Sequence, residues 1–356
     1  MIRTIDYSAL GSAVTKQDVA AYRAELARTK PGSSAAGWVA LAVVIVVLVV
    51  FGMMFLGIMV PAILTLSQSS TGAGAGIVVL LVPMLIFAAL IVGGVLLVRY
   101  LGTKKFERYV RLDRFAKANG LIFSPVDPNP NYPGAIFGSG HSRAAYEHFR
   151  SASDRYLDFG NYRYTTGSGK NQSTHTWGFM ALQLDRALPH MVLDSQANNF
   201  LGSNLPATFS KDQVLSLEGD FDRYFTLYCP KEYERDALYV FTPDLMALCI
   251  DNAAPFDIEI VDKWMFVYSA APFDMSTGPI YQRLFGIVDT VGAKTLTQTD
   301  RYSDERVANF TANYVAPQGA RLKRGVPVAA IVVGVIVLGF WIIPQIVAFT
   351  VALSGR

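Results

Sequence analysis

Three long runs of apolar residues, none containing a charged side chain, constrain this chain more than any other feature. They cover residues 38–66, 77–98 and 326–353. Each is longer than the roughly 20 residues that a helix needs to cross the hydrocarbon core of a bilayer. The first run begins too late and is too long for a cleaved signal peptide. The sequence therefore predicts three transmembrane helices.

The distribution of Lys and Arg around these runs predicts their orientation. The loop between the first two runs, SQSSTGAGAG, carries no charge, whereas basic residues cluster at 99–117 and 321–324. Lys and Arg concentrate on the cytoplasmic side of membrane proteins. We therefore expect a multi-pass plasma-membrane protein whose N-terminus and large domain are cytoplasmic and whose C-terminus lies outside.

Two regions remain outside the apolar runs. Residues 1–36 form a short N-terminal segment, in which TKQDVAAYRAELARTK predicts a helix that Thr15 and Asp18 can cap. Residues 102–324 are numerous enough to bury a core of their own. The expected fold class is therefore three transmembrane helices plus a cytoplasmic α+β domain with a mainly antiparallel sheet.

Aromatic, alternating segments supply the strands of that sheet. Residues 156–166 and 175–185 predict a hairpin joined by a glycine-bearing tip. FDIEIVDKWMFVYS, residues 256–269, alternates polar and apolar residues and predicts two strands with a turn near Asp262. Thr242, Pro243 and Asp244 predict the start of a helix, with Thr242 as the N-cap residue.

The tip of the predicted hairpin contains GSGK, which is reminiscent of a phosphate-binding loop. A loop of that kind needs a further glycine ahead of the GK pair and a Ser or Thr directly after it. Tyr164 stands in place of the glycine and Asn171 in place of the hydroxyl residue. We therefore expect a bend with Lys170 at its solvated tip, and no nucleotide.

The four histidines lack a recognised metal-ligand spacing. They are His141, His148, His175 and His190. His190 precedes Asp194, and such a pair can act as a base and its orienting group. No nucleophile motif accompanies it. A hydrogen-bonded structural histidine is the favoured interpretation.

The cysteines and acids also favour structural roles. Cys229 and Cys249 have no metal-ligand spacing and are expected in the core, in a reducing compartment. Asp220 and Asp222 form a DxD pair within the acidic segment 218–251, but no calcium loop completes it. We therefore predict no catalytic residue, no cofactor and no metal site. The net charge of +3 is too small to indicate nucleic acid.

The segment 213–270 resembles the bacterial membrane proteins grouped as domain-of-unknown-function family 3137. The matching positions are Phe221, Tyr224, Phe225, Tyr228, Asp236, Ala237, Tyr239, Phe241, Thr242, Pro243, Met246 and Tyr268. The resemblance implies hydrophobic helices paired with a cytoplasmic domain. It imports no activity, because the matched residues are mostly aromatic, aliphatic and capping residues.

These observations favour a non-catalytic interaction or scaffold domain as the function. Two alternatives stay open. The chain is an auxiliary subunit of a transport or envelope complex, or it is an enzyme such as a hydrolase whose site is assembled from distant residues, His190 and Cys229 among them. The expected partners are the lipid bilayer and a protein that the sequence does not name, with no nucleic acid.

Overall fold

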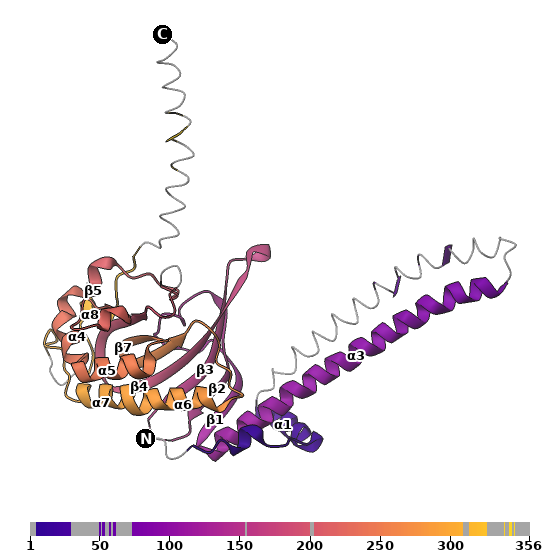
Figure 1. Cartoon of the computed structure of the whole chain (residues 1–356), viewed down its shortest axis with the longest axis horizontal. Coiled ribbons are helices and arrows are strands. Elements are labelled where there is room, and N and C mark those ends of the chain that lie inside the picture. Colours follow the sequence, from indigo (N-terminus) through magenta and orange to yellow (C-terminus); the bar gives the residue numbers. More distant parts are fainter. Residues whose placement is uncertain are drawn as a thin grey trace, which may run out of the picture. The chain divides into compact units, whose positions relative to one another are not determined.

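Figure 1 shows a computed structural model of the chain. The structure describes residues 5–29, 50, 52–53, 57, 60–61, 73–153, 155–199, 203–308, 313–325, 338, 342–343 and 345. The chain divides into two compact units. One is Gly11–Arg114, and the other combines Met1–Leu10 with Phe115–Arg356.

The unit Gly11–Arg114 contains helix α1, Lys16–Thr29, and most of the 46-residue helix α3, Ala73–Ala118. The predicted cap of α1 is confirmed, because Thr15 N–H donates to Asp18 Oδ2 (2.8 Å) and Asp18 N–H donates to Thr15 Oγ1 (3.2 Å). This reciprocal pair satisfies two N–H groups that a helix start leaves unbonded. Arg114 on α3 then pairs with Asp18 at 2.9 Å.

The prediction of three membrane-spanning helices requires correction. Within the residues that the structure describes, no helix is both long and apolar enough to cross a bilayer. The runs 38–66 and 326–353 lie almost entirely outside the described residues. The run 77–98 lies within α3, which continues through the basic segment to Ala118.

The physical reason is that hydropathy counts apolar residues without showing what they pack against or where a helix ends. The expectation of a multi-pass plasma-membrane protein with a cytoplasmic domain was built on those spans. It is therefore wrong as well, together with the assigned orientation of the termini.

The unit that follows Phe115 is built on a seven-stranded sheet whose strand pairings are all antiparallel. The strands are β1 Leu121–Pro128, β2 His141–Ser151, β3 Leu157–Thr166, β4 Ser173–Ser195, β5 Val214–Leu215, β6 Phe225–Tyr228 and β7 Asp257–Ser269. Their order is β1-β2-β3-β4-β6-β5, and β7 also pairs with β4. The predicted α+β class with an antiparallel sheet is thus confirmed.

Strand β4 organises this sheet because its 23 residues pair with three other strands. Its first half forms the predicted hairpin with β3, in register from Thr166 opposite Ser173 to Leu157 opposite Leu182. Its second half pairs with β6, and β7 runs along both halves. The 3-10 turn Gly169–Asn171 closes the hairpin, so GSGK forms a tip as expected.

The segment 256–269 does not form two strands. It is the single strand β7, and the turn expected near Asp262 is a bend at which that residue takes a positive φ of 53°. The ladder between β4 and β7 shifts register at the same place, between Gln183 and Leu188. A bulge of this kind bends a strand without reversing the chain.

Helices cover one face of the sheet (Figure 1). They are α4 Glu234–Val240, α5 Pro243–Ala253, α6 Gly278–Ile287 with a π-helical extension Val288–Gly292, and α7 Ala293–Thr299; the short α8 Pro317–Ala320 follows. Tyr281 and Phe285 of α6 lie against Phe159 of β3, with ring centroids 6.1 and 5.4 Å away. The expected cap of α5 is absent, because Thr242 Oγ1 is buried and has no hydrogen-bond partner.

One cluster of the core contains large aromatic side chains from β3, β4 and β7 and from the segment before β2. Phe137 from that segment contacts the rings of Tyr162, Phe179 and Phe266, at centroid distances of 4.7, 5.4 and 5.6 Å. This packing fixes the segment 129–140, and with it Tyr132, which takes part in the site described next.

Candidate functional site

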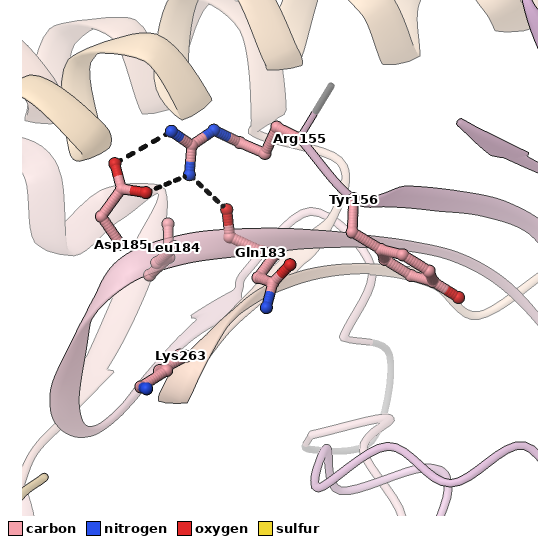
Figure 2. A pocket seen from close by; sticks show the side chains of 6 residues that line it. All are labelled: Arg155, Tyr156, Gln183, Leu184, Asp185 and Lys263. Atoms are coloured by element: carbon pink, nitrogen blue, oxygen red, sulfur yellow. Dashed lines mark hydrogen bonds and ion pairs between the residues drawn. The ribbon is translucent and has the colours of Figure 1, made fainter. Parts of the chain in front are cut away.

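A hollow of about 400 Å³ lies where β4 and β7 bend (Figure 2). Arg155 and Tyr156 line it from the segment before β3, Gln183, Leu184 and Asp185 from β4, and Lys263 from β7. The bulges that shift the β4–β7 register bring these residues together. Of its lining residues, only Leu184 is fully apolar in character.

Arg155 is held in the hollow by its neighbours. Its two terminal nitrogens donate to the Asp185 carboxylate at 2.8 and 2.9 Å, and one of them also donates to the Gln183 carbonyl at 3.0 Å. The side chains of Arg155 and Asp185 are 36% and 57% exposed, so water screens the pair and it adds little stability. Its main effect is to fix the plane of the guanidinium group.

Lys263 is the second cation of the hollow. It follows Asp262, the residue at the bend of β7, and its side chain is half-buried. Within the described part of the chain its ammonium group forms no ion pair. Figure 2 shows Gln183 between the Arg155 and Lys263 side chains, with its amide on the Lys263 side of β4.

Behind the hollow, Tyr156 begins a chain of hydrogen bonds that leads into the core. Its hydroxyl lies 2.8 Å from the Tyr132 hydroxyl, and Tyr132 donates to Asp158 Oδ2 at 2.6 Å. Because the Tyr132 proton is used there, Tyr156 must be the donor to Tyr132. The Tyr156 hydroxyl is therefore occupied, and its ring packs edge-on against Trp264 at a centroid distance of 5.6 Å while it lines the hollow.

The chain ends at a buried histidine between two carboxylates. His148 Nδ1 lies 2.8 Å from Asp158 Oδ1, and Nε2 lies 2.9 Å from Asp127 Oδ2. Burial alone would lower the His148 pKa, but the hydrogen bonds that the ring donates to Asp127 and Asp158 outweigh it and raise that pKa above its usual value of 6.5. With Arg150 Nη2 3.3 Å from Asp127, the two acids face two cations.

Local backbone features place His148 at this point. Glu147 has a positive φ of 46°, and the β2–β3 register shifts between Tyr146 and Phe149. Gly160 of β3 lies so close that an added Cβ would come within 2.4 Å of the His148 Cα. Only a glycine at position 160 leaves room for the bulge of β2, so Gly160 is required for this placement of His148.

His190 has a structural environment. It lies next to Glu259 rather than Asp194, with Nε2 2.8 Å from Glu259 Oε1. Its Nδ1 accepts the Leu322 N–H at 3.0 Å, so the proton is on Nε2. Glu259 also accepts from Tyr268 and from the Ala135 N–H, each at 2.7 Å. Both ring nitrogens of His190 are thus engaged, which leaves no basic lone pair for catalysis.

The two thiols are sealed in the core. Cys229 and Cys249 are free and buried. Burial, with smaller contributions from Glu234 and Asp236, raises the pKa of Cys229 to about 12. Burial also raises the pKa of Cys249 to about 12. A reactive cysteine needs a lowered pKa, so neither thiol is a nucleophile in this fold.

The remaining predicted candidates do not come together. His141 lies against the Gly167 carbonyl and His175 against Thr166. In the acidic segment, Asp222 accepts from the Ser216 hydroxyl and, at 3.1 Å, from the Leu217 N–H. Among the residues that the structure describes, no group of three or more His, Cys, Asp or Glu side chains is placed to hold a metal ion.

Sequence reasoning missed the buried acids of β4 and β7. The alternation around Asp257 and Glu259 predicted a strand and made no statement about their burial; both residues are buried, as is Asp194. Asp257 Oδ1 accepts from the Ser195 N–H at 2.9 Å and from Asn198 at 3.1 Å, and Oδ2 has no hydrogen-bond partner within the described residues. A buried acid of this kind can be recognised in a sequence as an acidic residue inside a strand that is covered on both faces.

Sequence comparison adds little to this description. No family model matches the sequence, and no curated protein matches it significantly. The crystal structure of the mycobacterial trehalose monomycolate transport factor A, TtfA, aligns at 11% identity over 53% of this chain and 92% of that one, with a TM-score of 0.35. An alignment this weak carries no argument. The resemblance of residues 213–270 to family 3137 therefore stays a prediction.

Proposed function

We propose that the unit built on the seven-stranded sheet is a non-catalytic interaction domain that binds a partner protein. The observation that carries the proposal is a contrast between its reactive and its accessible groups. His190, Cys229 and Cys249 are buried, and both ring nitrogens of His190 are hydrogen-bonded, whereas Arg155 and Lys263 line an open hollow.

The contrast matters because a catalytic group must reach its substrate in the correct protonation state. His190 has no free lone pair, and the thiols are protonated at neutral pH because their pKa is about 12. A binding surface has no such requirement. It needs exposed groups that are held in place, and Arg155 is held by Asp185 and Gln183.

The test is purification of the full-length chain through a tag, after chemical crosslinking in the cells that produce it. We expect the wild-type chain to bring one partner protein in stoichiometric amount. Lys263→Glu, in the hollow, should lose that partner. Lys170→Glu, at the hairpin tip, makes the same charge change outside the hollow and should keep it. Loss of the partner in neither variant, or in both, would refute binding through the hollow.

A further inference from the structure

We propose that the hollow binds an acidic peptide segment of the partner, with carboxylates of that segment accepting hydrogen bonds from Lys263 and Arg155. This inference rests on the proposed function and gives the chemical class of its ligand.

Arg155 retains donors after its internal contacts. A guanidinium group has five N–H donors. The contacts with Asp185 and Gln183 use three of them, so two remain. Because the internal contacts also fix the plane of the group, the remaining donors point in set directions and lose little entropy when a ligand binds.

Lys263 has a greater need for an acceptor. Its side chain is half-buried, and within the described residues no carboxylate lies in ion-pair range of the ammonium group. A partly desolvated cation gains more from a carboxylate than a fully solvated one does, because the interaction is less screened. A carboxylate from a partner would supply the acceptor that the fold leaves out.

The charge of the lining selects an anion over a cation. Arg155 and Lys263 are positive and Asp185 is negative, so the lining carries a net charge of +1. Asp185 is already bound by both terminal nitrogens of Arg155 and has less to offer a basic ligand. Like-signed groups on a ligand are disfavoured at such a surface.

A peptide fits the lining better than a small inorganic anion does. The Tyr156 hydroxyl is hydrogen-bonded to Tyr132, so Tyr156 contributes its ring to the lining of the hollow, beside Trp264. Glutamate side chains have methylene groups that can pack on such a ring. Arg155 comes from the segment before β3 and Lys263 from β7, with Gln183 of β4 between them (Figure 2), and a chain with successive acids can reach both.

The inference is tested by isothermal titration of the full-length chain with three probes. These are a capped hexaglutamate peptide, a capped hexaglutamine peptide and inorganic phosphate. We expect hexaglutamate alone to bind, and added salt to weaken it. Lys263→Gln should weaken binding roughly tenfold, the usual effect of losing one well-placed charge contact. Lys170→Gln is the matched control and should leave binding unchanged.

Three results would overturn the inference. They are no hexaglutamate binding, equal weakening by both variants, or phosphate binding that matches hexaglutamate and depends on Lys263 in the same way. The last would mean that the hollow takes a free anion. If hexaglutamate fails while the tagged chain still loses its partner on Lys263→Glu, the ligand class is wrong and the interaction domain stands. If the partner is also unaffected, the proposed function fails. Thermal melting of each variant checks that the fold is intact.

Discussion

Asp194 and Asp257 face each other across β4 and β7, one position beyond the Leu193–Ile258 pair of the ladder, and are 4% and 0% exposed. Within the described residues, no basic side chain pairs with either acid. Asn198 donates to Asp257 at 3.1 Å, and Asn199 donates to Asp194 at 3.0 Å. Burial raises the pKa of Asp257 to about 7, and the charge on Asp194 adds to the shift. Two carboxylates in such a site cannot both ionise freely.

This pair predicts how stability depends on pH. Because the folded-state pKa of Asp257 is raised from 3.8 to about 7, the folded protein holds this proton more tightly than the unfolded chain. Its contribution is fully present below pH 3.8, is lost as pH rises to about 7, and is constant above that. The loss is on the order of 4 kcal/mol, at 1.36 kcal/mol per pKa unit.

The measurement is urea unfolding of the wild-type chain and of Asp257→Asn between pH 4 and 8. The asparagine cannot ionise, so the variant should lose part of the pH slope and should exceed the wild type in stability above pH 7. Asp262→Asn, at the exposed bend of β7, is the matched control and should keep the wild-type slope. An identical slope in Asp257→Asn would contradict the assignment.

His148 adds a second pH dependence. Its folded-state pKa is raised above 6.5, so its stabilising charge is fully present below that value and is lost as pH rises through the folded pKa. Removing one partner from a buried charged network costs about 3–5 kcal/mol. His148→Gln should therefore unfold at much lower urea concentration at pH 6. His141→Gln, an exposed histidine, should change stability by less than about 0.5 kcal/mol. Equal effects of the two substitutions would show that the Asp127–His148–Asp158 contacts are not stabilising.

The close approach at Gly160 predicts a further loss. An alanine Cβ there would meet the His148 Cα at 2.4 Å and would force β2 and β3 apart. Overpacking of a closed core costs about 1–3 kcal/mol, and backbone contacts of this kind cannot be relieved by a side-chain rotation. Thermal melting should show a clear fall for Gly160→Ala. Gly138→Ala, where no atom lies within 4 Å of the added Cβ, should melt close to the wild type.

The thiol pKa values predict slow alkylation. At pH 8 in native conditions, iodoacetamide should leave Cys229 and Cys249 unmodified, because each thiol is buried and has a pKa of about 12. Both should react in denaturant. Lys170→Cys places a thiol at the exposed hairpin tip and serves as the positive control. The extent of alkylation is measured by mass spectrometry. Fast modification of Cys229 in the native protein would contradict this prediction and would support a nucleophilic role for that thiol.

Local sequence signals predicted part of the local structure. The Thr15–Asp18 cap and the β3–β4 hairpin depend on residues close together in the chain, and both are present. A turn between two strands was predicted at Asp262, where the structure has a bend within one strand. An aspartate with positive φ is compatible with either, so the sequence does not distinguish them. Asp257 and Glu259 were missed because alternation gives the period of a strand but not whether both faces are covered.

The hollow could not have been predicted from sequence. Arg155 and Lys263 are 108 positions apart in the chain and line the same hollow only in the folded sheet, where the β4–β7 register shifts. Its six lining residues follow no sequence motif, because what they share is their position in the folded sheet. Hydropathy, by contrast, predicted three membrane spans. That interpretation failed because the hydropathy of one apolar run does not show what the run packs against.

The most direct test of the account is to replace Lys263 with a photocrosslinking amino acid in the full-length chain and irradiate the cells that produce it. The account predicts one discrete product, joined to an acidic segment of a partner protein, that is absent when the same amino acid replaces Lys170 and is lost when Arg155→Ala is added. No product at position 263, or the same products at both positions, would contradict the claim that this hollow is the binding surface.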